Sequence, residues 1–141
     1  MQALAESAQT LTETGEELLY LKPGVAPALL WRLRRGRYAV RDEIDLHAMD
    51  ARTAEEVLKR FLEEARREER LCVKIIHGKG LRSRGRGPVL KALVDRMLRL
   101  RADVLAFAPA RPQQGGTGAT IVLLAARRPR RGGNFTPARP A

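Results

Sequence analysis

The sequence lacks the features that place a chain in a membrane or outside the cell. It has one cysteine, Cys72, so no internal disulfide can form, and a reducing environment is the expected setting. No apolar run approaches the ~18 residues of a membrane span. The start, MQALAESAQTLTETGEE, has neither the basic nor the apolar region of a secretory signal. We therefore expect a cytoplasmic protein with no membrane partner.

Acidic residues are also scarce, with 16 against 27 basic ones, a net charge of +11 and a pI near 11.1. The excess is focused on parts of the chain. Residues 71–101 hold nine Lys or Arg against Asp95 alone, and residues 31–41 hold five Arg and no acid. Such focusing favours a polyanionic partner, of which nucleic acid is the commonest. A solvated surface without a partner is the alternative.

The stretch 71–87, LCVKIIHGKGLRSRGRG, reads as a strand, a glycine-rich basic loop and the start of a helix. Backbone N–H groups and the helix dipole at such a junction bind anions, and the added Lys and Arg indicate phosphate. The nucleotide-binding pattern GxxxxGK[ST] is absent, which argues against nucleotide hydrolysis. The residues expected to bind phosphate are Gly78, Lys79, Gly80, Arg82, Arg84 and Arg86.

Hydrophobic periodicity predicts the order β-α-β-α-β-β. Strands joined by helices should be parallel and the last strand antiparallel, which gives an α/β domain of two layers with a mixed four-stranded sheet. The second helix is expected to bury Val89, Leu90, Leu93, Val94 and Met97. The predicted strands are 43–47, 72–76, 103–108 and 119–125, and the predicted helices are 51–69 and 88–100.

The domain is expected to span residues 43–126, between two flanking segments. Residues 1–42 form an N-terminal extension, with a disordered start and a short basic helix over residues 25–35 that ends at Gly36. Whether this helix packs on the domain or forms an arm is left open. Residues 127–141 are expected to be a disordered basic tail, and the chain is expected to be a monomer.

Two histidines are expected at one edge of the sheet. Strand alternation places Asp45 and His47 together on the face opposite Ile44 and Leu46. His47 and His77 lie at the carboxyl ends of the two strands of the predicted parallel pair, and these ends form the edge where ligands bind. We therefore expect both imidazoles to face one opening. The alternative for His47 is a structural hydrogen bond to a backbone carbonyl.

Three segments, Ile44–His47, Ile75–Gly80 and Gly115–Ala119, together resemble the Smr (small MutS-related) domain family. The resemblance covers about residues 43–125, with one departure at Ala48, where the family commonly has glycine. It implies the fold of the C-terminal domain of translation initiation factor 3, and endonuclease activity on DNA or RNA, in some bacterial members on mRNA at stalled ribosomes. It also implies a catalytic motif, Asp45 and His47, and two further loops, one with His77, Gly78, Lys79 and Gly80 and one with Gly115, Gly116 and Gly118. The glycines of the last loop are expected to contact the phosphates of the nucleic acid, as those of the His77 loop are.

The expected reaction is cleavage of nucleic acid, RNA rather than DNA, by acid and base groups. Asp45 would orient His47 as the base, His77 would be the acid or a phosphate ligand, and Lys79 would stabilise phosphoryl charge. No cofactor is predicted. A single divalent metal ion is an alternative, although two-metal nucleases use more carboxylates. A DNA-nicking enzyme, a non-catalytic nucleic-acid-binding module and a protein-interaction domain also remain open.

Overall fold

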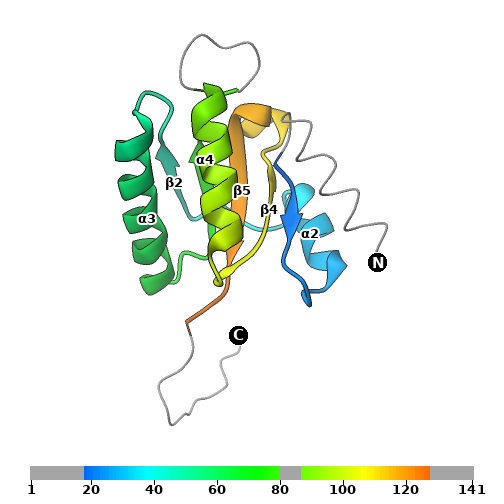
Figure 1. Cartoon of the computed structure of the whole chain (residues 1–141). Coiled ribbons are helices and arrows are strands. Elements are labelled where there is room, and N and C mark those ends of the chain that lie inside the picture. The colour runs from blue at the N-terminus through cyan, green and yellow to red at the C-terminus, as the bar shows by residue number, and fades with distance from the viewer. Residues whose placement is uncertain (1–17, 80–86, 128–141) are drawn as a thin grey trace.

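The computed structural model describes residues 18–79 and 87–127, which form a mixed sheet with helices on both faces (Figure 1). The predicted disorder of the start and the tail falls outside these residues, and the domain division stays a prediction. Within the described ranges, no helix combines the length and the apolar character needed to cross a membrane. The elements are β1 (Tyr20–Leu21), α2 (Pro27–Arg34), β2 (Asp42–Asp45), α3 (Ala51–Arg67), β3 (Cys72–Ile76), α4 (Gly87–Leu100), β4 (Val104–Pro109), η1 (Pro112–Gln114), η2 (Gly116–Gly118) and β5 (Ala119–Leu124).

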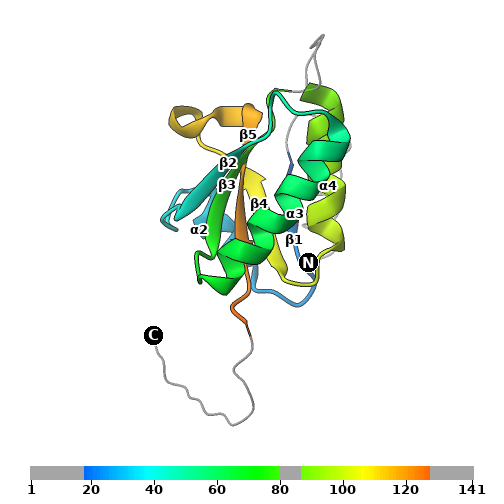
Figure 2. The ribbon, with the colours of Figure 1, turned by 90° about the vertical axis from the view of Figure 1, so that its left-hand side faces the viewer.

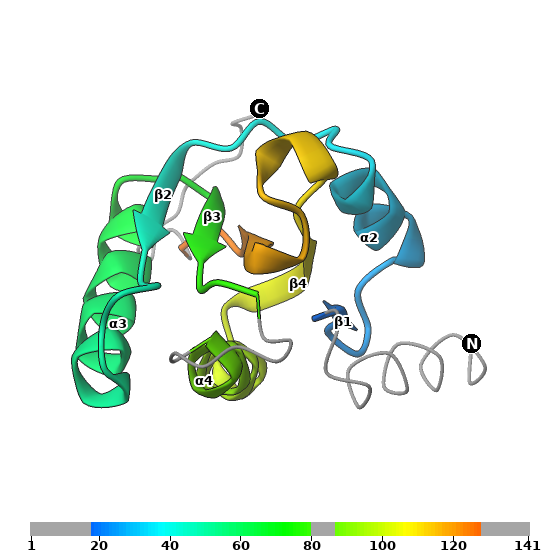
Figure 3. The same ribbon diagram turned by 90° about the horizontal axis from the view of Figure 1, so that it is seen from above.

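The sheet has the strand order β1-β4-β5-β3-β2, seen from above in Figure 3. β2 and β3 are parallel, with Ile44 opposite Ile75, and β5 runs antiparallel to both β3 and β4. β2, β3 and β4 therefore point the same way, which confirms the predicted strand directions. The sheet has five strands rather than four, because β1 pairs with β4 at the edge. Tyr20 of β1 stacks on Phe107 of β4, with ring centroids 5.2 Å apart.

α3 and α4 cover one face of the sheet (Figure 2). α3 begins after Asp50, whose side chain accepts a hydrogen bond from the backbone N–H of Thr53 at 2.8 Å, as expected of an N-cap. The prediction for Val89 of α4 is wrong, because it lies on the outer side of the helix and is 55% exposed. The residues of these helices that are buried against the sheet include Ala54, Leu58, Leu62, Ala65, Leu90, Leu93, Val94 and Leu98.

α2 packs on the opposite face of the sheet, which answers the question that the sequence left open. Leu30 and Leu33 of this helix are 2% and 3% exposed and belong to a cluster that includes Ala106 of β4 and Ile121 of β5. Gly36, just past the helix, has a φ of +75°, the left-handed conformation expected where glycine ends a helix. The helix therefore adds a partial third layer to the two predicted ones.

Candidate active site

The carboxyl ends of β2 and β3 lie at the same end of the sheet, where backbone hydrogen bonds connect three loops. The N–H of Leu46 donates to the carbonyl of Ile76 at 2.8 Å, which extends the pairing of β2 with β3. The carbonyl of Gly118 accepts from the N–H groups of His77 and Gly78, at 3.1 and 3.0 Å. The three segments that resemble the Smr family therefore meet in space. We call this edge, formed by residues 45–48, 76–79 and 115–118, the rim.

Asp45 and His47 form an exposed pair at the rim. Leu46 between them is fully buried, so alternation turns both polar side chains outward, as predicted. One carboxylate oxygen of Asp45 accepts a hydrogen bond from the backbone N–H of His47 at 3.0 Å and lies 2.6 Å from Nδ1 of its ring. The bonds from the ring and backbone of His47 hold the pKa of the Asp45 carboxyl below its ordinary value. Asp45 is therefore an ionised carboxylate in a fixed orientation.

This carboxylate determines the tautomer of the His47 ring. An ionised carboxylate only accepts hydrogen bonds, so Nδ1 carries the proton and Nε2 of the neutral ring carries a lone pair. In the part of the chain that the structure describes, Nε2 has no hydrogen-bond partner. The side chains of His47 and Asp45 are 61% and 51% exposed, so a substrate can reach Nε2. A carboxylate that orients an imidazole in this way produces a general base.

His77 lies in the interior rather than at an opening. It is 1% exposed, and Nδ1 and Nε2 lie 2.8 Å from the Gly78 carbonyl oxygen and the Thr120 hydroxyl, respectively. Burial lowers the pKa of His77 to about 4; the bond to Gly78 opposes this shift and the charge of Lys91 adds to it. The expectation that both imidazoles face one opening is therefore wrong, and neither nitrogen of the neutral ring is free for a substrate.

Strand alternation explains the direction of His77. Val73 and Ile75 belong to the core beneath α3 and α4, and His77, two residues further, continues on that side. Lys74 between Val73 and Ile75 agrees with this direction, but Cys72 and Ile76, on the same face as Lys74, are apolar, so the alternation in β3 is incomplete. Its partner Thr120 was missed for the same reason. The only signal was a hydroxyl near the start of an otherwise apolar strand.

The loop after β2 does not need the glycine that the Smr family commonly has there. Ala48 occupies that position, and its backbone has no positive φ. The glycine that the rim requires is Gly78, which has a φ of +90°. A Cβ added to Gly78 would lie 3.7 Å from the Cβ of His47, so the two loops lie in close contact. The departure at Ala48 is compatible with the Asp45–His47 geometry.

The loop before β5 lies beside Lys79. Gly115 and Gly116 have φ values of +120° and +54°, so the turn depends on residues without a side chain. A Cβ added to Gly118 would lie 3.4 Å from Cγ of Lys79, which shows that this exposed lysine passes directly over the loop. The structure thus brings together five of the residues predicted to contact the phosphates of a nucleic acid, and it places them beside His47: Gly78, Lys79, Gly115, Gly116 and Gly118.

Two parts of the predicted site are not settled by this geometry. Gly80, Arg82, Arg84 and Arg86 lie outside the described residues, so their contact with phosphate stays a prediction. Among the described residues, no group of three or more His, Cys, Asp or Glu side chains is placed to hold a metal ion.

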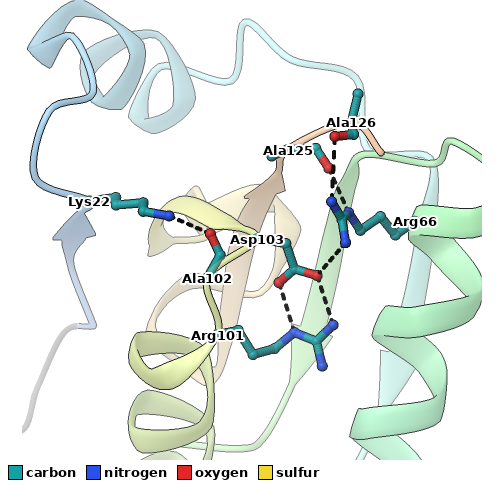
Figure 4. Close-up of a pocket in the computed structure, with 7 residues that line it drawn as sticks. All are labelled: Lys22, Arg66, Arg101, Ala102, Asp103, Ala125 and Ala126. Carbon is teal, nitrogen blue, oxygen red and sulfur yellow. Dashed lines mark hydrogen bonds and ion pairs between the residues drawn. The ribbon is translucent and has the colours of Figure 1, made fainter. Parts of the chain in front are cut away.

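A second polar cluster lies at the opposite end of the sheet, around a cavity of about 530 Å³ (Figure 4). Asp103 accepts hydrogen bonds from Nε and Nη2 of Arg101 at 2.9 and 2.8 Å. Arg66 of α3 lies 3.3 Å from the same carboxylate and donates to the carbonyl of Ala125 at 2.9 Å. Lys22 donates to a backbone carbonyl beside them. This cluster connects α3 to the start of β4 and the end of β5, and it contains none of the predicted site residues.

Comparisons with known proteins agree with the motifs. The profile of the Smr domain matches residues 44–125. The ribosome rescue factor SmrB of Yersinia pseudotuberculosis is 32% identical over 116 residues, which cover 82% of this chain and 62% of that protein. The chain thus spans about three fifths of the length of such curated relatives.

Solved structures lead to the same family. The crystal structure of YdaL, a stand-alone small MutS-related protein from Escherichia coli, matches with a TM-score of 0.69 and 28% identity, over 77% of this chain and 83% of that one. The Smr domain of Thermus thermophilus MutS2 matches with a TM-score of 0.52 and 33% identity, over 62% of this chain and 99% of that one. With the family profile covering more than half of its length, the chain belongs to the Smr domain family.

Proposed function

We propose that this protein is an endonuclease that cleaves RNA at the rim, with His47 as the general base. The observation that carries the proposal is the exposed Nε2 of His47, on a ring that Asp45 holds in place through Nδ1. Membership of the Smr family supports a nuclease. The relatives named ribosome rescue factor support mRNA on a stalled ribosome as the substrate, and the cytoplasm as the location.

In the proposed reaction, Nε2 of His47 removes the proton from a ribose 2′-OH. The 2′-oxygen then bonds to the adjacent phosphorus, and the bond from phosphorus to the 5′-oxygen of the next nucleotide breaks. This leaving oxygen takes a proton from water, to which the rim is open, and the hydroxide that forms takes the proton from Nε2 of His47, which restores the neutral ring. The products are a 2′,3′-cyclic phosphate and a 5′-OH end. A positioned general base contributes about 10²- to 10⁴-fold to such a rate.

Lys79 is the group proposed to stabilise the phosphate. It is exposed, and it lies over the Gly118 loop on the same rim as His47. Its ammonium group would bind the phosphoryl oxygens, on which negative charge grows in the transition state. His77 does not transfer a proton in this proposal. Its buried ring joins Gly78 to Thr120, so it holds the turn that leads to Lys79.

The test is the chemistry of the RNA ends. A labelled mRNA is incubated with the protein, free in EDTA and, separately, on stalled ribosomes in Mg²⁺, and the products are analysed by mass spectrometry. We expect a cyclic phosphate and a 5′-OH end in both settings, and no cleavage of DNA of the same sequence. Ends with a 5′-phosphate, lost on addition of EDTA to free RNA, would instead support the metal-dependent alternative.

Asp45→Asn is the informative variant, and Asp42→Asn is its matched control. Both residues are on β2, but Asp42 pairs with Arg70 at 3.1 Å, away from the rim. Asp45→Asn removes the charge that orients His47 and should abolish most cleavage, whereas Asp42→Asn should retain it. If the wild type binds RNA and DNA but cuts neither, the chain is a binding module and the nuclease proposal is wrong.

A further inference from the structure

α2 and the segment after it form an exposed basic surface on the sheet face opposite α3 and α4 (Figure 3). Residues 31–41 contain five arginines and no acid. None of these arginines, nor Arg111, forms an ion pair with any residue that the structure describes. We call this the α2 surface; it consists of Trp31, Arg32, Arg34, Arg35, Arg37 and Arg111.

Trp31 is the single tryptophan of the chain, and 44% of it is exposed on this surface. Its neighbours Leu30 and Leu33 fill the core, but Trp31 belongs to neither core cluster. The guanidinium of Arg34 lies over the indole, 5.4 Å from the ring centroid. Exposed aromatic rings among cations are the surfaces on which unpaired nucleobases stack. Packing in the core therefore does not account for the position of Trp31, and its exposed area is available for a ligand.

Direct contacts join the α2 surface to the rim. Arg111 donates from Nη1 to the carbonyl of Arg35, so the loop after β4 is tied to the end of α2. The carbonyl of Arg111 accepts from the N–H of Gly116 at 3.0 Å. Two residues later, Gly118 lies beneath Lys79, next to the His47 loop. The loop of residues 111–118 therefore connects the rim, where Lys79 lies, to α2 and its arginines.

We propose that the α2 surface binds the single-stranded segment of RNA next to the bond that is cleaved, with Trp31 stacked on a base and the arginines on phosphates. The proposal rests on the proposed function, since it extends the substrate outward from the rim. Charge complementarity favours a polyanion, and the exposed indole favours one with accessible bases. Bases in a duplex already stack on one another, which selects a single strand over a double one.

Intrinsic fluorescence tests the stacking, because Trp31 is the only tryptophan. The full chain with His47→Ala, which prevents cleavage, is titrated with oligouridine of twelve nucleotides and with polyglutamate of equal charge. We expect the RNA to quench the emission and polyglutamate to leave it unchanged. Measured by anisotropy of labelled oligouridine, Trp31→Ala should weaken binding about 5- to 100-fold, and Trp31→Phe should restore part of the loss.

A double variant, Arg32→Gln with Arg35→Gln, tests the binding of phosphates. It should lower the slope of log K against log salt by about 1.4, which is about 0.7 for each phosphate of a single strand that the variant no longer neutralises. The matched control is Arg60→Gln with Arg67→Gln, which removes the same charge from the exposed side of α3 on the other face of the sheet. This control should leave most of the salt dependence intact.

The outcomes separate this proposal from the nuclease. Equal weakening in the two double variants, or equal quenching by polyglutamate and oligouridine, would overturn the α2 proposal; the second result would indicate an acidic protein partner. Cleavage that depends on His47 without any response of Trp31 also overturns it, and the nuclease then stands. Quenching by RNA, weakened by Trp31→Ala, with no cleavage by the wild type, supports the α2 surface and overturns the nuclease.

Discussion

The two ends of the sheet both pair a carboxylate with a basic side chain, but they leave different groups free. At the rim, Asp45 binds Nδ1 of the His47 ring, and the other ring nitrogen, Nε2, is open to solvent. At the opposite end, both oxygens of Asp103 accept from Arg101, and Arg66 lies against the same carboxylate. The first pair keeps a proton acceptor for a substrate, whereas the second uses both oxygens to hold the fold together.

The difference shows that a hollow does not by itself mark a reactive site. The cavity of about 530 Å³ lies at the Asp103 end, where the guanidinium groups that line it already have protein partners (Figure 4). At that end, burial raises the pKa of the Asp103 carboxyl, but the hydrogen bond and charge of Arg101, with the charge of Arg66, hold it below its ordinary value. The rim is distinguished by an imidazole nitrogen that lacks a described partner.

The largest effect is expected from His47→Ala. If Nε2 is the general base, cleavage should fall about 10²- to 10⁴-fold, and the free energy of unfolding should change little because the side chain is 61% exposed. Single-turnover cleavage and urea unfolding of the same preparation measure both. A large loss of stability with unchanged cleavage would mean that His47 stabilises the fold and is not the general base.

The pH dependence of stability should come from the other histidine. The pKa of His77 is lowered to about 4 in the folded state, against 6.5 for an ordinary histidine. The unfolded chain therefore takes up a proton first as the pH falls, so stability is complete above pH 6.5 and decreases toward pH 4. The loss should reach up to about 3 kcal/mol, and urea unfolding at half-unit pH steps measures it.

His77→Gln and His47→Gln form a matched pair for this measurement. His77→Gln removes the titrating group and should flatten the pH dependence between pH 6.5 and 4. His47→Gln makes the same replacement at an exposed histidine and should retain the decrease that His77→Gln removes. If the stability of His77→Gln depends on pH as that of the wild type does, protonation of His77 is not the cause of the pH dependence.

At the opposite end, Asp103→Ala should cost stability without affecting cleavage. The substitution leaves Arg101 and Arg66 partly buried without their anion, and hydrogen bonds to charged groups contribute about 2 kcal/mol. Asp42→Ala is the comparison, because Asp42 is more exposed and forms one ion pair, with Arg70, worth less than about 1 kcal/mol, beside a hydrogen bond from the backbone N–H of Glu43. Similar losses in the free energy of unfolding would show that the contacts of Asp103 with Arg101 and Arg66 stabilise the fold no more than an exposed ion pair does.

The sequence predicted most of the fold because local patterns carried the information. Helical spacing of apolar residues located α3 and α4, and the connections between elements predicted the strand directions that the sheet has. The strand β1 was missed because two residues form no recognisable pattern; its pairing with β4 depends on contacts distant in sequence, such as Tyr20 with Phe107.

The site was predicted in part for the same reason. Asp45 and His47 could be placed because β2 is an edge strand whose polar and apolar residues alternate. For His77 the alternation was incomplete, since Cys72 and Ile76 are apolar on the same face as Lys74, and its bond to Thr120 comes from the register of β3 with β5. A single sequence contains no local signal for such a register.

The smallest expected effect comes from the backbone conformation at the two ends of the sheet. At the rim, positive φ values belong to Gly78, Gly115 and Gly116, whereas at the end of α3 a non-glycine residue, Glu69, has a φ of +62°. An L-residue in this conformation costs about 1–2 kcal/mol, and glycine avoids this cost but loses about 0.5–1 kcal/mol of backbone entropy.

Glu69→Gly should therefore stabilise the protein by about 0.5 kcal/mol. Its neighbour provides the control, because Glu68 has a φ of −88° and nothing to gain from glycine. Glu68→Gly should destabilise the protein by about 0.5–1 kcal/mol, so the two substitutions, identical in chemistry, should have opposite signs in urea unfolding. If both destabilise, the left-handed conformation costs Glu69 less than the backbone entropy that glycine loses at this position.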